Sequence, residues 1–351
     1  MFKDQAQAVE SGGTALQAAG DLTVNIGVTA TEARNIALDV AKATFYELSA
    51  GARETVSVRV EEITDKVISK LEKEFPEGLQ KAVDPDFQYA LFNVQKQYGR
   101  TGDAELGDLL VSLLVDRCKQ DERDILQIVL NESLDTAPKL TKSHLALLAV
   151  LFFLRYTKVS SINGHDDLGR YLDVNLRGFR EEVVKSNYNS LLLHLEFAGC
   201  GSAKEGSLPL EKILCMHFPG LFMKGFDSVE LSELDISVDV SSTLFSRCLN
   251  DPAKYQISAL DVATLERLFV EHGIAVEERS KISALFLAQL LPDEKVRAAC
   301  IKIRPYMHDL FEMWTSSTLK SFMLTSVGIA IGHAVIKGSV KEFSDLSVWI
   351  N

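Results

Sequence analysis

The chain has 351 residues, with 37 lysines and arginines against 49 aspartates and glutamates, which gives a formal net charge of -12. Hydrophobic residues make up 46% and charged residues 25% of the chain. This is an ordinary globular composition, and it excludes collagen-like, disulfide-framework and wholly disordered proteins. The acidic balance argues against a nucleic-acid partner, because phosphate binding needs clustered Lys and Arg. At about 150 residues per domain, the length suggests two domains.

Three features favour a cytoplasmic protein without a membrane partner. The sequence begins MFKDQAQAVESGG, which carries charges and no apolar core, so we expect no secretory signal. The five cysteines are odd in number and widely spaced, which favours reduced thiols. The uncharged stretch 321–336 would span about 24 Å as a helix, short of the roughly 30 Å hydrocarbon core. We expect it to be buried in the protein, with membrane perturbation as a weaker alternative.

The N-terminal segment predicts a short strand. Leu22, Val24 and Ile26 alternate with polar residues and would line one face of that strand, while residues 14–18 could form its partner. An isolated two-stranded hairpin is marginal in water, so the strand is expected to pair further. It would dock either on its own chain or between subunits.

Two helices are predicted next. Thr29 and Glu32 match a capping box that starts the first. The second ends at Phe75, because the residue before a proline is pushed out of the α region. On a segment otherwise crowded with charge, it carries a narrow apolar seam, close to a heptad: Val56, Val60, Ile63, Val67 and Leu71.

This seam has two interpretations. It is typical of coiled-coil-like pairing between subunits, and with Leu22, Val24 and Ile26 it would then form the oligomerisation surface of a homo-oligomer. Alternatively, it belongs to an ordinary amphipathic helix that packs on its own domain.

The middle of the chain, residues 84–185, predicts an irregular helical bundle. Asp84 before Pro85 is a typical helix start. The run 144–156 is apolar nearly all round, which predicts the central buried helix.

The last part, residues 186–351, mixes the two element types. Helices are predicted at 261–272, 277–291 and 305–320, and strands at 191–197, 221–226, 236–240, 255–259 and 346–350. Phe322 to Leu324 lead into a further helix with Thr325 as its N-cap. In that helix, Gly328 and Gly332 form a GxxxG pattern that would permit close approach to another helix in the core. The expected fold is therefore α+β and predominantly α-helical, with an N-terminal strand and long-helix arm (1–83), a helical bundle (84–185) and an α+β C-terminal domain (186–351).

The sequence contains no strong catalytic or metal motif. The glycine-rich loop 199–207 lacks the lysine that a Walker A loop needs to reach phosphates. A metal site built from His194, Cys200, Cys215 and His217 would match no tight zinc spacing. We therefore expect no cofactor and no metal.

Two His-Asp pairs resemble the metal-binding pair of HD-type phosphohydrolases: His165-Asp166 and His308-Asp309. That chemistry needs further His and Asp ligands that converge on the metal. Catalytic residues are therefore left unassigned, although scattered His, Asp and Cys could still assemble a site in the fold.

Three blocks, at residues 19–49, 84–117 and 324–351, resemble an uncharacterised family of bacterial proteins. The resemblance implies a bacterial cytoplasmic protein without an assigned enzyme activity. The first block is similar to segments found ahead of varied effector domains in phage-defence and other conflict-related proteins. This implies an assembly or adaptor element.

Two functions follow as hypotheses. The first is a non-enzymatic, self-associating assembly or adaptor protein with a protein partner, in a stress or anti-phage response. The second is an effector enzyme, either a hydrolase or a nuclease, with a site built from scattered His, Asp and Cys.

Overall fold

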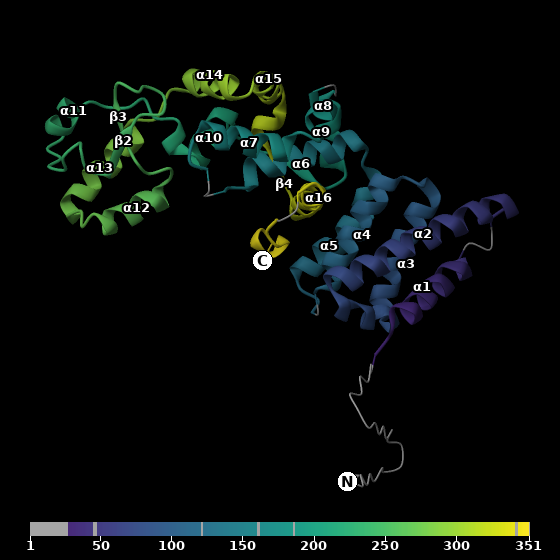
Figure 1. The fold of residues 1–351 in the computed structure, drawn as a ribbon. Helices are drawn as coiled ribbons and strands as arrows, with labels where there is room; N and C mark the ends of the chain where they lie inside the picture. The colour runs from purple at the N-terminus through teal and green to yellow at the C-terminus, as the bar shows by residue number, and fades with distance from the viewer. Residues whose placement is uncertain are drawn as a thin grey trace, which may run out of the picture.

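Figure 1 shows the computed structural model of the chain, which describes residues 27–44, 48–120, 122–159, 162–184, 187–340 and 343–350. These residues are mainly helical and include two small antiparallel sheets, so the expected fold class is confirmed. The helices form a bent, elongated body with a small lobe at one end (Figure 1). The strand predicted at Leu22, Val24 and Ile26 lies outside the described residues.

The first helices form one bundle. They are α1 (Ala30–Thr44), α2 (Ala50–Glu74), η2 (Pro76–Val83), α3 (Pro85–Thr101), α4 (Ala104–Cys118), α5 (Ile125–Thr136) and the short η3 (Ala137–Lys139). The Glu32 carboxylate accepts from the Thr29 amide at 2.9 Å, and the Asp84 side chain accepts from the amide of Phe87 at 2.9 Å. Both predicted helix starts are therefore confirmed, since these side chains satisfy amides that the first turn leaves free.

The apolar seam of α2 lies inside this bundle. Ile63, Val67 and Leu71 are buried in the main core, and α2 packs against α3 and α4. Val56 and Val60 are buried in a smaller cluster with two residues of α1. The seam therefore packs on its own chain, the second interpretation above. Its side chains are not accessible to another subunit in this conformation.

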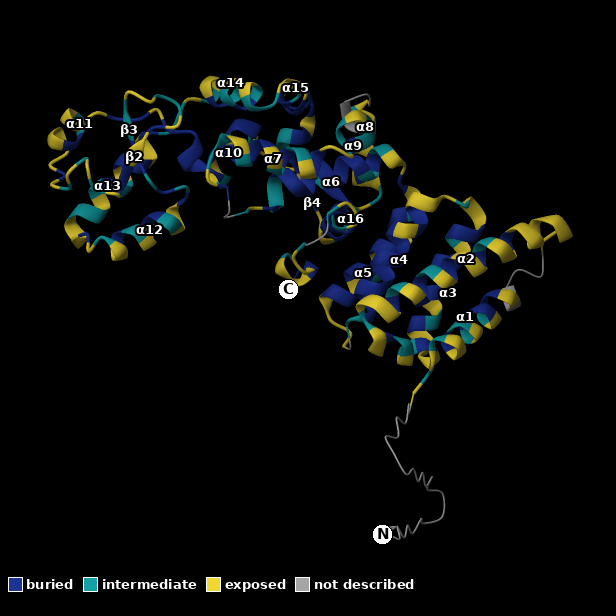
Figure 2. Cartoon of the chain, viewed as in Figure 1, coloured by how far each residue is buried: buried dark blue, intermediate teal, exposed yellow. Residues whose placement is uncertain are grey.

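The central helix α6 (Lys142–Tyr156) is buried as predicted, with residues 146–154 all nearly inaccessible to solvent. Figure 2 shows buried residues concentrated along α4, α5 and α6. The main core also receives side chains from later helices: α7 (His165–Leu176), α9 (Tyr188–Phe197), α10 (Leu210–His217), α14 (Asp293–Ile303) and α15 (Met307–Ser316). The short α8 (Arg180–Val184) packs on α6.

The helix α16 (Ser326–Lys337) returns from the far end of the sequence and lies against α6, α5 and α4. The strand before it, β4 (Phe322–Leu324), follows η5 (Thr318–Ser321) and pairs antiparallel with β1 (Gly201–Ala203), with Ser202 opposite Met323. The Thr325 hydroxyl accepts from the amide of Gly328 at 3.2 Å, so the predicted N-cap is confirmed.

Two glycines permit the close approach of α16, as predicted. A Cβ atom at Gly328 would lie 1.9 Å from the carbonyl oxygen of Cys200, and one at Gly332 would lie 2.9 Å from the carbonyl oxygen of Leu148. Real Cβ atoms do not approach backbone oxygens so closely, so larger residues would push α16 away from its neighbours.

The lobe has a core of its own, formed by residues between Met223 and Phe286. After the turn η4 (Pro219–Leu221), its elements are α11 (Ser228–Glu233), β2 (Phe245–Arg247), β3 (Tyr255–Ile257), α12 (Val262–Glu271) and α13 (Val276–Ala288). β2 and β3 pair antiparallel. The helices predicted at 261–272, 277–291 and 305–320 are confirmed as α12, α13 and α15.

Four predicted strands are wrong. Residues 191–197 belong to α9, residues 346–350 contain the turn η6 (Leu346–Val348), and 221–226 and 236–240 form no extended ladder. Only 255–259 contains a strand, β3. Short apolar runs do not distinguish a strand from one turn of buried helix. Residues 191–197 are helical because Asn187 caps the helix: its side chain accepts from the amide of Ser190.

Candidate functional site

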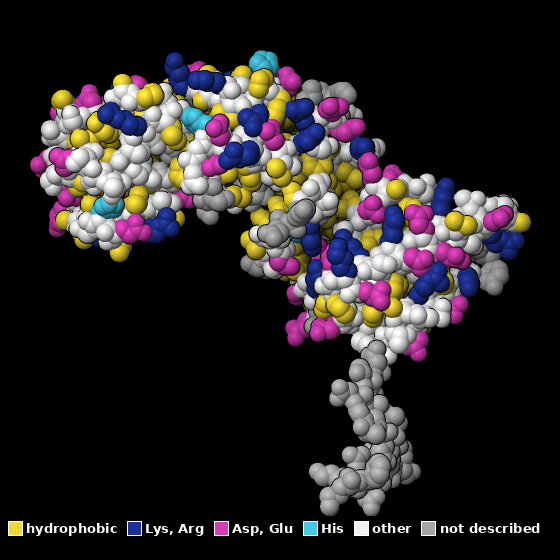
Figure 3. Space-filling model, in the orientation of Figure 1, with side chains coloured by type: hydrophobic (Ala, Val, Ile, Leu, Met, Phe, Trp, Pro, Cys, Tyr) yellow, Lys and Arg dark blue, Asp and Glu magenta, His cyan; other side chains and the backbone are white. Residues whose placement is uncertain are grey.

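A groove of about 990 Å³ lies between the α1–α5 bundle and the helices that follow it. Helices α2 and α4 line one side, and α6, α8 and α16 line the other. Hydrophobic side chains gather in the recess beneath α8 and α9 (Figure 3). The apolar lining consists mainly of Leu109, Val111, Leu145, Ala146, Phe179 and Val335.

Several charged residues on the rim of this groove are paired within the chain. Lys66 donates to Asp108 at 2.9 Å, which joins α2 to α4, and it lies 3.6 Å from Glu62. Lys142 donates to Glu105 at 2.9 Å, which joins α6 to α4 across the groove. Exposed pairs of this kind contribute little stability, but each one satisfies charges that a partner would otherwise have to neutralise.

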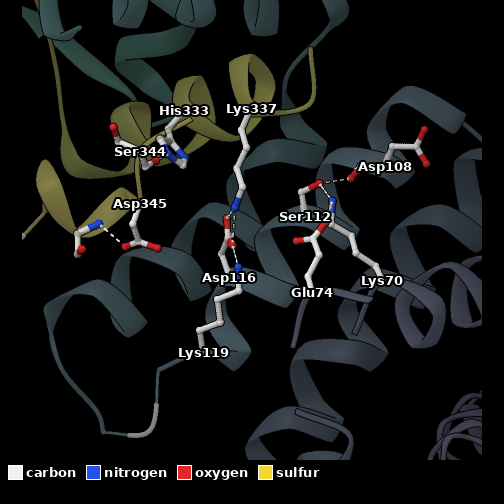
Figure 4. Close-up of polar contacts among 11 residues, drawn as sticks. Lys70, Glu74, Asp108, Ser112, Asp116, Lys119, His333, Lys337, Ser344 and Asp345 are labelled. Carbon is white, nitrogen blue, oxygen red and sulfur yellow. Dashed lines mark hydrogen bonds and ion pairs between the residues drawn. The ribbon is translucent and has the colours of Figure 1, made fainter. Parts of the chain in front are cut away.

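A third rim lysine is held in the same way. Lys70 donates to the hydroxyl of Ser112 at 2.9 Å and lies 3.6 Å from Glu74 (Figure 4). The Ser112 hydroxyl in turn donates to the backbone carbonyl of Asp108 at 2.9 Å. This chain of contacts positions the side chains of α2 against α4 along the groove.

Two of these contacts raise the pKa of a rim lysine and keep its side chain positively charged. The hydrogen bond from Lys66 to Asp108 raises the pKa of Lys66, and the bond from Lys142 to Glu105 raises the pKa of Lys142. A lysine that acts as a base or nucleophile needs the opposite shift, towards the neutral amine. The rim lysines are therefore suited to binding rather than to proton transfer.

An ion cluster fastens α16 beside the groove. Lys337 donates to both carboxylate oxygens of Asp116, at 2.8 and 2.9 Å, and Lys119 donates to one of them at 2.8 Å (Figure 4). Burial would raise the pKa of Asp116, but Lys337 and Lys119 outweigh it and hold that pKa below its ordinary value. The cluster ties α4 to the C-terminal end of α16, which forms one side of the groove.

The segment after α16 is held by a buried histidine. His333 donates from Nε2 to the carbonyl oxygen of Ser344 at 2.8 Å, and its ring packs edge-on against Phe152. Within the described residues, its Nδ1 has no hydrogen-bond partner. Trp349 donates to the carbonyl oxygen of Tyr156 at 2.7 Å and completes the contact. Burial lowers the pKa of His333, so its ring is neutral at neutral pH.

The His-Asp pairs found in the sequence serve local contacts. His165 bonds through Nε2 to the carbonyl oxygen of Leu221 at 3.0 Å, and His308 is exposed with its Nδ1 3.5 Å from Asp309. Across the described ranges, no group of three or more His, Cys, Asp or Glu side chains could hold a metal ion.

The other chemical candidates are also occupied by structural roles. All five cysteines are buried, and burial raises the pKa of Cys118 and Cys200 to about 12 and that of Cys215 to about 11. The thiols of these three cysteines stay protonated and are poor nucleophiles. His194 bonds to the carbonyl oxygen of Lys139 at 2.9 Å, and the glycine-rich loop contributes β1.

Most of the uncharged stretch 321–336 is buried, as expected. It forms the last residue of η5, β4 and most of α16, whose residues from Gly328 to Ala334 are buried, while Met323, Thr325 and Ser326 are exposed. In the part of the chain that the structure describes, no helix combines the length and apolarity that crossing a bilayer requires.

The groove itself was not anticipated from the sequence. Its rim residues on α2 read as a solvated charged face, and the partners of Lys66 and Lys142 lie about 40 positions away. No local spacing signals such a pair.

Comparison with known proteins gives one positive result. Neither the curated proteins nor the solved structures contain a significant match to this chain. The model of one uncharacterised family matches residues 27–350, nearly the whole chain. The protein therefore belongs to this uncharacterised family.

Proposed function

We propose that the protein is a non-enzymatic assembly or adaptor protein that self-associates and binds a protein partner, with the groove as its contact surface. The observation that carries this proposal is the combination of an apolar lining with rim charges that are already paired. Grooves with an apolar lining and a few fixed polar groups are typical sites for segments of other proteins.

The paired rim lowers the cost of covering the groove. A charge that loses water without gaining a partner is expensive, and binding would normally incur that cost at each rim lysine. Here Lys66, Lys70 and Lys142 bring their own partners, so a segment that covers the lining meets three of the four groove lysines already paired.

The protonation states also favour binding over catalysis. The raised pKa values of Lys66 and Lys142 keep both amines protonated, and the raised pKa values of Cys118 and Cys200 keep their thiols protonated. Catalytic bases and nucleophiles need shifts in the other direction. These shifts support the assembly hypothesis over the effector enzyme.

The biological setting belongs to the same proposal. The similarity of residues 19–49 to segments that precede effector domains in phage-defence proteins supports a bacterial stress or anti-phage role. Leu22, Val24 and Ile26 stay candidates for strand pairing between subunits, because three alternating apolar residues need a partner face. The five seam residues of α2 no longer belong to this surface, since they pack inside the chain.

Native mass spectrometry of the full chain purified from cells tests the proposal. We expect a mass above that of one chain, or the mass of one chain with a retained protein partner. We expect no retained metal or nucleotide. Light scattering across the micromolar range provides the second measurement. A single-chain mass under all conditions, without a retained protein, would contradict the proposal.

A further inference from the structure

Helix α9 presents an apolar ridge to solvent. Leu193 is 68% exposed and Phe197 is 85% exposed, and the two side chains stand one helical turn apart. Phe197 is the most exposed large hydrophobic side chain among the described residues. Leaving a phenylalanine and a leucine together in water is unfavourable in proportion to their apolar area, so a contact that covers them gains that area.

The ridge is carried on a rigid, weakly charged helix. The opposite face of α9 is buried through Leu192 and Leu195, which belong to the main core. Its sequence, YNSLLLHLEF, contains Glu196 as its single formally charged residue. By contrast, the exposed Val58 lies on α2, a helix that is crowded with charge.

The groove has the complementary properties. Its apolar side chains are flanked by charged residues, and Lys66, Lys70 and Lys142 among these are paired within the chain, so the groove suits an apolar occupant that brings almost no charge. The side formed by α2 runs from Glu62 to Glu74, which is roughly 18 Å at 1.5 Å per residue. At the same rise the ten residues of α9 span roughly 15 Å. Length, polarity and charge therefore agree.

We propose that α9 of one copy inserts Leu193 and Phe197 into the groove of a second copy. This inference rests on the proposed self-association and names the surface that performs it. α9 packs on α6, and α6 contributes Leu145 and Ala146 to the groove, so ridge and groove belong to the same rigid body. In the proposed dimer a two-fold axis relates the two copies, so that each ridge enters the groove of the other copy and the assembly closes.

The test uses the full chain with charges placed at exposed positions, which leaves the core intact. Phe197→Glu puts a carboxylate on the ridge. Ser69→Arg and Ser339→Arg, both at exposed residues that line the groove, fill it from opposite sides. Val58→Glu is the matched control, because Val58 is 64% exposed on α2 and lies outside the groove.

Sedimentation or light scattering across a concentration series measures the dimer dissociation constant. We expect the parent chain and Val58→Glu to dimerise equally, and each ridge or groove variant to dimerise at least about ten-fold more weakly. Circular dichroism melts check that every variant is folded.

Mixing two variants sharpens the test. Phe197→Glu keeps a normal groove and Ser69→Arg keeps a normal ridge, so a mixed dimer regains one intact contact of the two. We expect the mixture to associate more tightly than either variant alone. If the parent chain dimerises but Phe197→Glu and Ser69→Arg do not weaken it, this surface is excluded and self-association stands. If the parent chain is monomeric throughout, this inference and the self-association on which it rests both fail, and only a retained protein partner in native mass spectrometry would still support the proposed function.

Discussion

The main body and the lobe differ in how far apart in the sequence their core residues lie. The core of the lobe draws only on one continuous stretch between Met223 and Phe286. The core of the main body collects side chains from Ala33 at one end to Ile350 at the other. The lobe can thus complete its core as soon as its own segment has folded, whereas the body requires the two ends of the chain to meet.

Helix α16 is the element that closes the body. It fills the space between α4, α5 and α6, and the Asp116–Lys337 contact and the β1–β4 pair fasten it there. The groove depends on the same helix, since Ala334 and Val335 lie in its lining. A destabilising substitution in α16 should therefore lower the stability of the whole main body. A destabilising substitution in the lobe core should affect only the lobe.

The largest expected effect comes from Gly328→Ala. The new methyl group would lie 1.9 Å from the carbonyl oxygen of Cys200, and a backbone atom cannot rotate away. We expect a loss of about 3 kcal/mol or more in the free energy of unfolding, although alanine is the better helix former by about 1 kcal/mol. Chemical denaturation followed by circular dichroism measures it.

Gly338→Ala is the control for this substitution. A Cβ atom at Gly338 would lie 3.5 Å from its nearest neighbours, which is ordinary contact distance. The two variants add the same methyl group near the two ends of α16, so they separate packing from helix propensity. Equal stability of both variants would show that the close approach at Cys200 does not limit the fold.

A smaller and local effect is expected from Ile282→Val in the lobe. Ile282 is fully buried in the core of the lobe, and removing one methyl group from such a site costs about 0.5–1.5 kcal/mol. Hydrogen exchange should speed up in α12 and α13 by up to roughly ten-fold, while α6 and α16 keep their rates. Faster exchange in α6 as well would mean that body and lobe unfold together, which would break the distinction between the two cores.

The smallest expected effect is a pH dependence that originates in the body. The pKa of His333 is lowered in the folded state, so between that value and the unfolded value of about 6.5 the unfolded chain binds more protons. The stability that neutral His333 contributes is therefore complete above about pH 6.5 and is lost as the pH falls further.

His333→Gln should flatten this dependence between neutral and mildly acidic pH, with an effect below the roughly 1 kcal/mol expected for Ile282→Val. Thermal melts across that pH range measure it, with the exposed His308→Gln as the control. Burial also lowers the pKa of His144 and His217, so part of the slope should remain. An unchanged slope in His333→Gln would exclude His333 as a source of the dependence.

Helix starts could be predicted from the sequence because capping is local. Thr29, Asp84 and Thr325 each satisfy an amide no more than three residues ahead, and a pattern that short is visible in the sequence. The buried character of α6 was also predictable, since a helix that is apolar all round has no polar face that could be exposed to solvent.

The strand predictions failed where local pattern is ambiguous. Residues 191–197 alternate too little to separate a strand from a helix, and the Asn187 cap determines the outcome. The seam of α2 was ambiguous in another way. Its spacing predicts a helix that packs against another helix, but the spacing is the same whether that second helix comes from the same chain or from another subunit.

The sequence by itself therefore determined the helix starts at Thr29, Asp84 and Thr325 and the buried character of α6, because each of these depends on neighbours within a few residues. Only the tertiary structure decided which surfaces meet. The pairs Lys142–Glu105 and Asp116–Lys337 join residues from distant helices, and the groove exists only once those helices are packed. Local periodicity identifies the apolar face of a helix, but the geometry of the whole chain determines what covers that face.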